Sequence, residues 1–326
     1  MSLFAASLRR FALILSTVVL CAPSAFAADY PAHPVHIIVP FAPGGGTDLI
    51  TRTLADIIAK EWNATIVIDN KPGGGTTIGA MAVATAPADG YTLLATSNSF
   101  LLTPMMLPAK PYVWDRDFTG VSLFAVSPHI LVVNPAVPAH TLDEFAAWAK
   151  TQNGNVSFAS FGSGSSNHLG FEVLRRKLGI EMVHVPYKGS APALNDLLAG
   201  HVQAMLGDIQ NVSGQITAGS LRPLAVANEK RLAAMPDLPT IDELGVKGFT
   251  SKSWFGAVMR KDTPPEIVAK WGAAFAEALR RPDVKARLAP LGVELAGYSP
   301  EQMQQFLTDE AAKGTEAVKT SGATME

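Results

Sequence analysis

The chain has 326 residues, 48% of them hydrophobic, and its formal net charge is −2. This length is enough to bury a large core, and it favours two domains over one. The acidic balance argues against a nucleic-acid-binding protein, because phosphate contacts need a basic face. Composition therefore favours a globular protein with more than one domain.

The first 27 residues have the pattern of a secretory signal peptide. Arg9 and Arg10 form a positive region, residues 11–21 form an apolar region shorter than a comfortable membrane span, and residues 25–27 (Ala-Phe-Ala) form a cleavage site. We expect cleavage after Ala27 and secretion of the mature chain; an uncleaved anchor is the alternative. The only cysteine, Cys21, leaves with this segment, so the mature chain has no disulfide and no cysteine metal ligand.

The next segment predicts a strand at 35–39, a glycine turn at 40–48 and a helix that ends near Trp62. Three consecutive glycines let the backbone turn tightly and allow close approach of a ligand. Thr47 or Asp48 is expected to cap the helix. The free N–H groups at a helix start form an anion site that needs no basic side chain. We therefore expect a carboxylate to bind at this turn.

The chain continues with alternating strands and helices. A second glycine turn at 70–77 separates the predicted strand 65–69 from the predicted helix 78–86, and Ser97-Asn98-Ser99 follows the predicted strand 91–96. This order predicts a parallel, doubly wound sheet with ligands at the carboxyl ends of its strands. The proline-rich stretch 104–117 is expected to be irregular.

A second set of elements repeats this style. Strands are predicted at 121–126, 130–133, 156–160, 182–185, 204–206, 224–227 and 254–258, and helices at 141–150, 168–178, 190–198, 265–280, 282–288 and 300–319. We expect an α/β fold with two doubly wound domains and a ligand cleft between them. After the signal peptide 1–27, domain 1 is predicted at 28–127 plus 248–326, and domain 2 at 128–247.

The glycine turns do not match nucleotide-binding motifs. No Gly-Lys-Ser/Thr follows any turn, and Leu49, Ile78 and Asn167 stand where a dinucleotide fingerprint would have its third glycine. The seven histidines have no metal-ligand spacing, and a Gly-x-Ser-x-Gly elbow is absent. We therefore expect no cofactor, no metal and no catalytic residue. The turns are either simple tight turns or anion sites, and their repetition at one sheet edge favours a ligand cleft.

Two further positions carry open alternatives. Tyr187-Lys188 is either a donor pair at the cleft mouth or a solvated loop. Asp208 directly follows a buried strand, where it can cap the next segment or accept a hydrogen bond from a ligand hydroxyl, ammonium or protonated acid. Trp254, Phe255 and Trp271 are expected in the core rather than the cleft.

Motifs in order along nearly the whole mature chain match one family. They are residues 40–45 with Asp48, 70–74, 89–94, 160–169, 185–189, 194–200, 205–208, 224–226, 236–240 and 254–256. The chain resembles the periplasmic solute-binding receptors of tripartite tricarboxylate transporters, often called Bug-type receptors. The resemblance implies two α/β domains that close like a Venus flytrap, as in type II periplasmic binding proteins. It also implies that backbone amides and ordered waters near the first glycine turn hold a carboxylate.

Binding residues are carried over by position. They are Phe41, Pro43, Gly44, Gly45, Thr47, Asp48, Ser97, Asn98, Ser160, Ser165, Ser166, His168, Tyr187, Lys188 and Asp208. Phe161 departs from the small residue usual in the family: it either forms an aromatic wall, suiting an aromatic or bulky acid, or points into the core. Thr76-Thr77 also depart from the family turn, which leaves the role of that loop open.

The resulting interpretation is a binding protein, not an enzyme. It captures a small organic acid, such as a di- or tricarboxylate or an aromatic carboxylate, in the periplasm and delivers it to the permease subunits of a membrane transporter. Two alternatives remain: a receptor that signals to a sensor, and a secreted serine hydrolase using Ser165 or Ser166.

Overall fold

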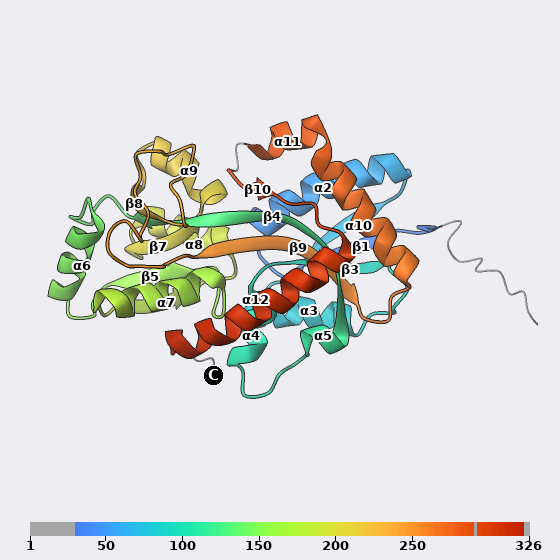
Figure 1. Ribbon diagram of the computed structural model, residues 1–326, viewed down its shortest axis with the longest axis horizontal. Helices are drawn as coiled ribbons and strands as arrows, with labels where there is room; N and C mark the ends of the chain where they lie inside the picture. The colour runs from blue at the N-terminus through green and yellow to red at the C-terminus, as the bar shows by residue number, and fades with distance from the viewer. Residues whose placement is uncertain (1–29, 290–291, 323–326) are drawn as a thin grey trace, which may run out of the picture. The chain divides into compact units, whose positions relative to one another are not determined.

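The strands of the chain form one mixed β-sheet (Figure 1) in the computed structural model, which describes residues 30–289 and 292–322. Its order is β2-β1-β3-β9-β4-β7-β5-β6, and β8 and β10 also pair with β4. The strands are β1 Val35–Val39, β2 Ile66–Asn70, β3 Thr92–Thr96, β4 Phe118–Val133, β5 Ser157–Ser160, β6 Val183–Pro186, β7 Ala204–Asp208, β8 Arg222–Ala227, β9 Lys252–Arg260 and β10 Glu294–Leu295. The expected signal peptide lies outside the described residues.

Helices connect and cover these strands (Figure 1). They are α2 Gly46–Trp62, α3 Thr77–Ala84, α4 Ser99–Met106, α5 Trp114–Asp117, α6 Leu142–Thr151, α7 Ser166–Leu178, α8 Ser190–Ala199, α9 Ile209–Thr217, α10 Pro265–Arg280, α11 Pro282–Leu288 and α12 Pro300–Ser321, with a 3-10 turn η1 at Gly74–Thr76. The last helix, α12, packs against β4, α4 and α7. No helix in the described ranges is long and apolar enough to cross a membrane.

The predicted parallel pairing holds in two parts of the sheet. β1 pairs in parallel with β2 and β3, and β5 pairs in parallel with β6 and β7. Between these two groups, β9 and β4 are antiparallel to each other and to their outer neighbours, and β8 is antiparallel to β4. The parallel pairing predicted for the strand–helix repeat at 35–96 is confirmed, and the antiparallel strands β9 and β4 lie between the two parallel groups.

β4 is one strand of 16 residues where the sequence predicted two strands around Ser127-Pro128. Ser127 lies opposite Ser253 and Pro128 lies opposite Lys252, so the pairing with β9 continues through the proline. Proline removes one donor from the ladder, but its fixed φ is compatible with extended backbone. β4 therefore runs from one group of parallel strands to the other.

The stretch 104–117, predicted to be irregular, is partly helical: α4 runs into it with Pro104 inside the helix, and α5 forms its last four residues. A proline in a helix frees the carbonyl four residues earlier. Here that carbonyl is Phe100 O, and the Tyr112 hydroxyl donates a hydrogen bond to it over 2.8 Å. A tertiary contact thus satisfies the group that the proline leaves open, which local sequence patterns do not reveal.

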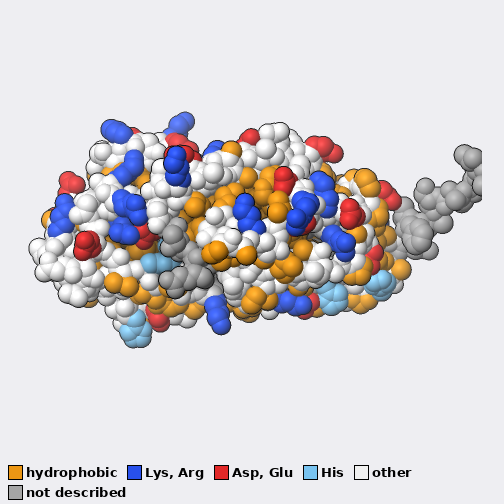
Figure 2. All heavy atoms as spheres, turned by 90° about the horizontal axis from the view of Figure 1, so that it is seen from below, with side chains coloured by type: hydrophobic (Ala, Val, Ile, Leu, Met, Phe, Trp, Pro, Cys, Tyr) orange, Lys and Arg blue, Asp and Glu red, His pale blue; other side chains and the backbone are white. Residues whose placement is uncertain are grey.

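The large hydrophobic clusters divide between two parts of the sequence, a first part made of both ends of the chain and a second part made of residues 130–249. One joins residues from Ile38 to Val126 with residues from Trp254 to Phe306 and Ala311, and two others use residues between Ile130 and Phe249. A small fourth cluster around Leu102, Met106 and Leu169 lies where α4, α7 and α12 meet. On the face shown in Figure 2, basic and acidic side chains are interspersed among hydrophobic ones, without an extended basic surface.

Candidate functional site

The first glycine turn starts α2 without a side-chain cap. The N-cap residue is Gly45, and no side chain bonds to the first-turn N–H groups there. The prediction that Thr47 or Asp48 would cap this helix was therefore wrong. The backbone passes so close to its neighbours that a Cβ on Gly46 would meet the Phe255 ring at 3.1 Å and also the Gln210 side chain. The first-turn N–H groups of α2 therefore have no side-chain cap and can donate hydrogen bonds to a bound group.

Asp48 instead holds the turn together. Its carboxylate accepts hydrogen bonds from the Gly44 N–H, from Arg52 Nε and from Asn70 Nδ2, each at 3.0 Å. Asn70 Nδ2 also donates to Phe41 O at 3.0 Å. Burial raises the pKa of Asp48, but the hydrogen bonds from Arg52, Gly44 and Asn70 outweigh it, so the net pKa is lowered. The carboxylate therefore fixes the turn, and it is not among the residues that line the small cavity described next.

A small cavity of about 20 Å³ lies in front of the α2 N-terminus. That is room for one or two water molecules. Its lining comes from the carboxyl ends of β1, β3, β5 and β7, from the starts of α2 and α8, and from β9. The lining residues are Phe41, Gly45, Gly46, Thr47, Ser97, Phe161, Ser190, Asp208, Ser253 and Phe255. Convergent strand ends are where open α/β sheets bind ligands.

The cavity lining contains neither lysine nor arginine. Its positive potential comes from helix starts: α2 begins at Gly46, α8 begins at Ser190, and both have glycine N-caps without side-chain cap bonds. Helix α4 begins two residues after Ser97, and α9 begins directly after Asp208. Each helix start carries about half a positive charge, and several together favour an anion.

Asp208 is the one acidic lining residue, and it is buried with 2% of its surface exposed. It occupies the N-cap position of α9 but makes no side-chain cap bond. His129 Nε2 lies 3.2 Å from Asp208 Oδ1, while the hydrogen bond of that nitrogen goes to Ser253 Oγ at 2.9 Å. Asp208 Oδ1 itself accepts no hydrogen bond in the described chain.

The structure brings six of the predicted site residues together around the cavity. They are Phe41, Gly45, Thr47, Ser97, Phe161 and Asp208. Phe161 lines the cavity and also belongs to a hydrophobic cluster of residues between Ile130 and Leu238. It therefore forms part of the cavity wall and part of the core. Gly44 and Asp48 support the turn from behind through their mutual hydrogen bond, and Pro43 precedes them on the exposed side.

Three other predicted residues lie beneath the turn after β5. Ser165 caps α7 by accepting a hydrogen bond from the His168 N–H, and its hydroxyl lies 2.6 Å from Gly162 O. Ser160 Oγ is 2.6 Å from Nε2 of His184, and the rings of His168 and His184 stack at 3.8 Å. Burial lowers the pKa of His168 to about 4 and that of His184 to about 3. These side chains stabilise the turn and do not line the cavity.

Of the two alternatives for Tyr187-Lys188, the arrangement of the side chains is the one expected of a solvated loop. The Tyr187 hydroxyl donates to Asp196 Oδ2 at 2.6 Å, and the Lys188 side chain is exposed. What reaches the cavity region is the backbone: Lys188 O accepts a hydrogen bond from the Ala42 N–H at 2.9 Å. This bond joins the first glycine turn to the turn after β6.

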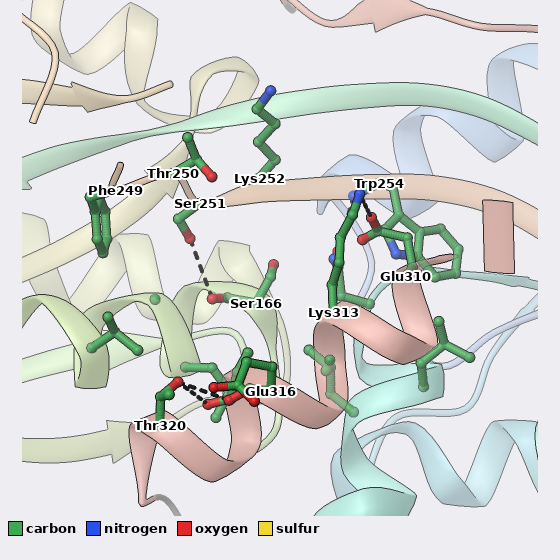
Figure 3. A pocket seen from close by; sticks show the side chains of 18 of the residues that line it. Ser166, Phe249, Thr250, Ser251, Lys252, Trp254, Glu310, Lys313, Glu316 and Thr320 are labelled. Carbon is green, nitrogen blue, oxygen red and sulfur yellow. Dashed lines mark hydrogen bonds and ion pairs between the residues drawn. The ribbon is translucent and has the colours of Figure 1, made fainter. Parts of the chain in front are cut away.

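Asn98 and Ser166 line a second, larger hollow of about 630 Å³. Figure 3 shows this groove between α12, α7 and the chain that leads into β9, with Lys252, Lys313 and Glu310 along it. Asn98 Oδ1 accepts a hydrogen bond from the Trp254 N–H at 3.0 Å. Asn98 and Ser166 therefore face the groove and not the small cavity.

Sequence reasoning missed Gly46, Ser190, Ser253 and Phe255 as lining residues. Gly46 and Ser190 stand at helix starts after glycine turns, so the same argument that selected Gly45 extends to them. On β9, Ser253 and Phe255 face the cavity while Lys252 and Trp254 face the groove, as strand alternation requires. Phe255 was expected in the core, and it is buried, but its ring also forms part of the cavity wall.

The serine hydrolase alternative finds no geometric support. Among the described residues, no histidine ring nitrogen forms a hydrogen bond with Ser165 Oγ or Ser166 Oγ; the one histidine contact of Ser165 Oγ is the backbone N–H of His168, which cannot act as a base. Ser253, His129 and Asp208 lie together, but the same nitrogen, His129 Nε2, faces both Ser253 and Asp208. A catalytic triad needs the serine and the acid on opposite ring nitrogens. The described chain also contains no cluster of three or more His, Cys, Asp or Glu suited to a metal.

Comparison with known proteins agrees with this reading. The family described as "Tripartite tricarboxylate transporter family receptor" (TctC) matches residues 50–323. Protein BugT of Bordetella pertussis is 35% identical over 316 residues, covering 96% of this chain and 97% of BugT. Rpa4515 of R. palustris, whose structure is described "with adipate", has a TM-score of 0.87 at 33% identity, covering 91% of this chain and all of that one.

Two further solved structures are similar. The periplasmic binding protein BugD has a TM-score of 0.86 at 34% identity and covers 91% of this chain and 100% of its own. MatC from Rhodopseudomonas palustris, described "with bound malate", has a TM-score of 0.85 at 32% identity, covering 89% of this chain and 100% of MatC. The chain has the mixed α/β fold of these periplasmic binding proteins, and it is a solute-binding receptor, not an enzyme, of the tripartite tricarboxylate transporter receptor (TctC, Bug-type) family.

Proposed function

We propose that this receptor captures a small organic carboxylate in the periplasm and delivers it to the permease of a tripartite tricarboxylate-type transporter. The observation that carries the proposal is the cavity at the bare start of α2, which contains helix N-termini and hydroxyl groups but no basic side chain. A helix start binds an anion through its N–H groups and its dipole. The relatives described with adipate and with malate support a carboxylate as the anion.

Entry of the ligand requires the walls of the cavity to separate. A cavity of about 20 Å³ is too small for a four-carbon acid. The Ala42–Lys188 backbone hydrogen bond and the close approach of Gly45 to Ser190 hold the walls together. These contacts join residues 28–127 plus 248–326 to residues 128–247, which we propose act as two lobes. Closing them over a ligand excludes water and strengthens its hydrogen bonds.

A thermal-shift screen of residues 28–326 tests the capture step. The protein is first unfolded and refolded to remove bound solutes, and is then heated with mono-, di- and tricarboxylates, aliphatic and aromatic. A ligand that binds only the folded state stabilises it by about 2.7 kcal/mol at a hundredfold excess over its Kd. A shift confined to a subset of acids supports the proposal, and an aromatic subset assigns Phe161 a contact with the ligand. No shift with any acid contradicts it.

Secretion and delivery need their own measurements. We propose cleavage after Ala27, and mass spectrometry of the exported protein should find Ala28 as its first residue. Transport should require both this receptor and its permease: uptake of the identified acid stops when either is deleted. Unchanged uptake without the receptor, together with a lost transcriptional response to the acid, would favour the sensor alternative.

A further inference from the structure

The cavity has a donor side and an acceptor side. The donor side is the start of α2, where Gly46 and Thr47 line the cavity. The acceptor side is the Asp208 carboxylate at the end of β7. β1, which leads into α2, and β7 stand four positions apart in the sheet, so these groups come from opposite walls. The walls approach each other closely, because Gly46 lies against Gln210, two residues beyond Asp208.

The Asp208 carboxylate makes neither of the contacts that would explain its burial, a helix cap or a hydrogen bond to Oδ1. It does not cap α9, and Oδ1 accepts no hydrogen bond in the described chain although it is buried. A buried carboxylate oxygen without a donor is costly, and such a group in a native protein calls for an explanation. Although Asp208 stands at the start of α9, that helix does not supply a hydrogen-bond donor to Oδ1.

The neighbouring histidine limits what can satisfy Asp208. A carboxylate oxygen 3.2 Å from His129 Nε2 requires a proton on that nitrogen, because two lone pairs would repel. The Nε2–H then points to Ser253 Oγ at 2.9 Å, and Nδ1 accepts from the Ser251 hydroxyl at 2.8 Å. Ser253 therefore receives a hydrogen bond from His129, and its own proton points either to Ser166 Oγ at 3.4 Å or into the cavity. No group of the described chain is thus left to donate to Asp208 Oδ1.

We propose that Asp208 selects acids that carry a hydroxyl or ammonium group beside the bound carboxylate. This inference rests on the proposed function: the carboxylate lies at the start of α2, and its substituent donates a hydrogen bond to Asp208. An acid without such a donor leaves Asp208 unsatisfied and places a second negative charge next to it. The favoured ligands are therefore hydroxycarboxylic acids and amino acids. Mono- or dicarboxylic acids with the same carbon skeleton but no hydroxyl or ammonium group should bind more weakly.

The test uses acids that differ only in the donor group. Dissociation constants are measured by calorimetry for malate and aspartate against succinate, and for mandelate against phenylacetate, with the refolded parent protein. We expect the donor-bearing acid of at least one set to bind tenfold or more tightly, since a hydrogen bond to a buried charged group discriminates at this level. Equal binding, or a preference for the plain acid, would overturn the inference while leaving carboxylate capture intact. No binding by any of these acids would also overturn the inference, whereas carboxylate capture is decided separately by the wider thermal-shift panel.

An Asp208→Asn variant then identifies the residue responsible. Asparagine keeps the shape and removes the charge, so the preference should fall to less than threefold or reverse in favour of the plain acid. The matched control is Asp237→Asn, which removes an exposed acid and should keep the parental preference. A preference unchanged in Asp208→Asn would overturn the assignment. The comparison within the parent protein needs no variant, so the inference stays testable even if Asp208→Asn does not fold.

Discussion

Replacing Asp48 with alanine tests whether the first glycine turn is held by one buried carboxylate. Asp48 is 2% exposed and accepts bonds from Gly44, Arg52 and Asn70, while Asn70 also bonds Phe41 O. The substitution removes the group on which these donors converge. The turn that carries Phe41, Gly45 and the start of α2 should then lose its fixed geometry.

The loss of unfolding free energy in Asp48→Ala depends on whether each former donor can bond water instead. A hydrogen bond to a charged group contributes about 1.5–3 kcal/mol net, and leaving a buried partner unsatisfied adds to the loss. The Arg52 side chain is 44% exposed and the Gly44 backbone is exposed, so both can bond water instead. The loss is therefore smaller than the sum over three bonds, at about 2–3 kcal/mol. For a compact unit that spans residues 33–326, that loss lowers Tm by roughly 3–5 °C.

The assay is urea unfolding and thermal unfolding of the parent, Asp48→Ala and a control. The control is Asp56→Asn on the same helix, whose partner Arg287 is 3.4 Å away with both side chains more than half exposed, so its effect should stay below about 1 kcal/mol. A ligand found for the parent should also bind Asp48→Ala more weakly. Parental stability together with parental affinity in Asp48→Ala would refute the role of Asp48.

The stabilisation by Asp48 should decrease as the pH is lowered. The folded-state pKa of Asp48 lies below its ordinary value of 3.8, so its contribution is complete above that value and is lost as the pH falls through the folded pKa. The stability difference between the parent and Asp48→Asn should therefore be full at pH 7 and shrink below about pH 4. A difference that persists undiminished in acid would contradict the charge-based explanation.

Three other predictions follow from the same structure. Burial lowers the pKa of His168 and His184 from 6.5 to about 4 and about 3, so stability should be full above pH 6.5 and fall below it, by roughly 2 kcal/mol for each histidine by pH 5 in urea unfolding. The fall should be shallower in His184→Gln, and an equal fall in both proteins would contradict this explanation. Ser165→Ala should cost about 1 kcal/mol through loss of the α7 cap, and neither it nor the parent should hydrolyse esters; turnover by the parent would revive the hydrolase alternative. Gly46→Ala should lose the ligand-induced thermal shift, because the added methyl meets the Phe255 ring; a retained shift would place the ligand elsewhere.

Local patterns predicted the regular elements well. The strand at 35–39, the helix ending at Trp62 and the helices 265–280 and 282–288 agree with β1, α2, α10 and α11. The elements that escaped prediction depend on tertiary contacts. Helix α4 tolerates Pro104 because of the Tyr112 hydroxyl, and β4 continues through Pro128 because β9 pairs with it. The Tyr112 hydroxyl reaches Phe100 O from outside α4, and β9 lies far along the chain from Pro128, so the periodicity of the local sequence reveals neither contact.

For the candidate site too, the sequence placed residues on the correct turns but did not give the directions of all their side chains. The first glycine turn and a strand end pointed to Gly45 and Asp208, and the family resemblance added Phe41 and Ser97; all four line one cavity. Residues such as His168 were placed near the ligand by position in the chain, but helix α7 turns the ring towards His184. Sequence places a residue on a turn, whereas the direction of its side chain depends on packing against distant segments.

The central claim is that backbone N–H groups at the start of α2, and not a basic side chain, hold a carboxylate. A crystal structure of the refolded protein with an acid identified by thermal shift tests it most directly. The account predicts a carboxylate oxygen within about 2.7–3.2 Å of Gly46 N or Thr47 N, or joined to them by one ordered water. A carboxylate bound instead to a lysine or arginine, such as Lys252 or Lys313 in the groove between α7 and α12, would contradict it.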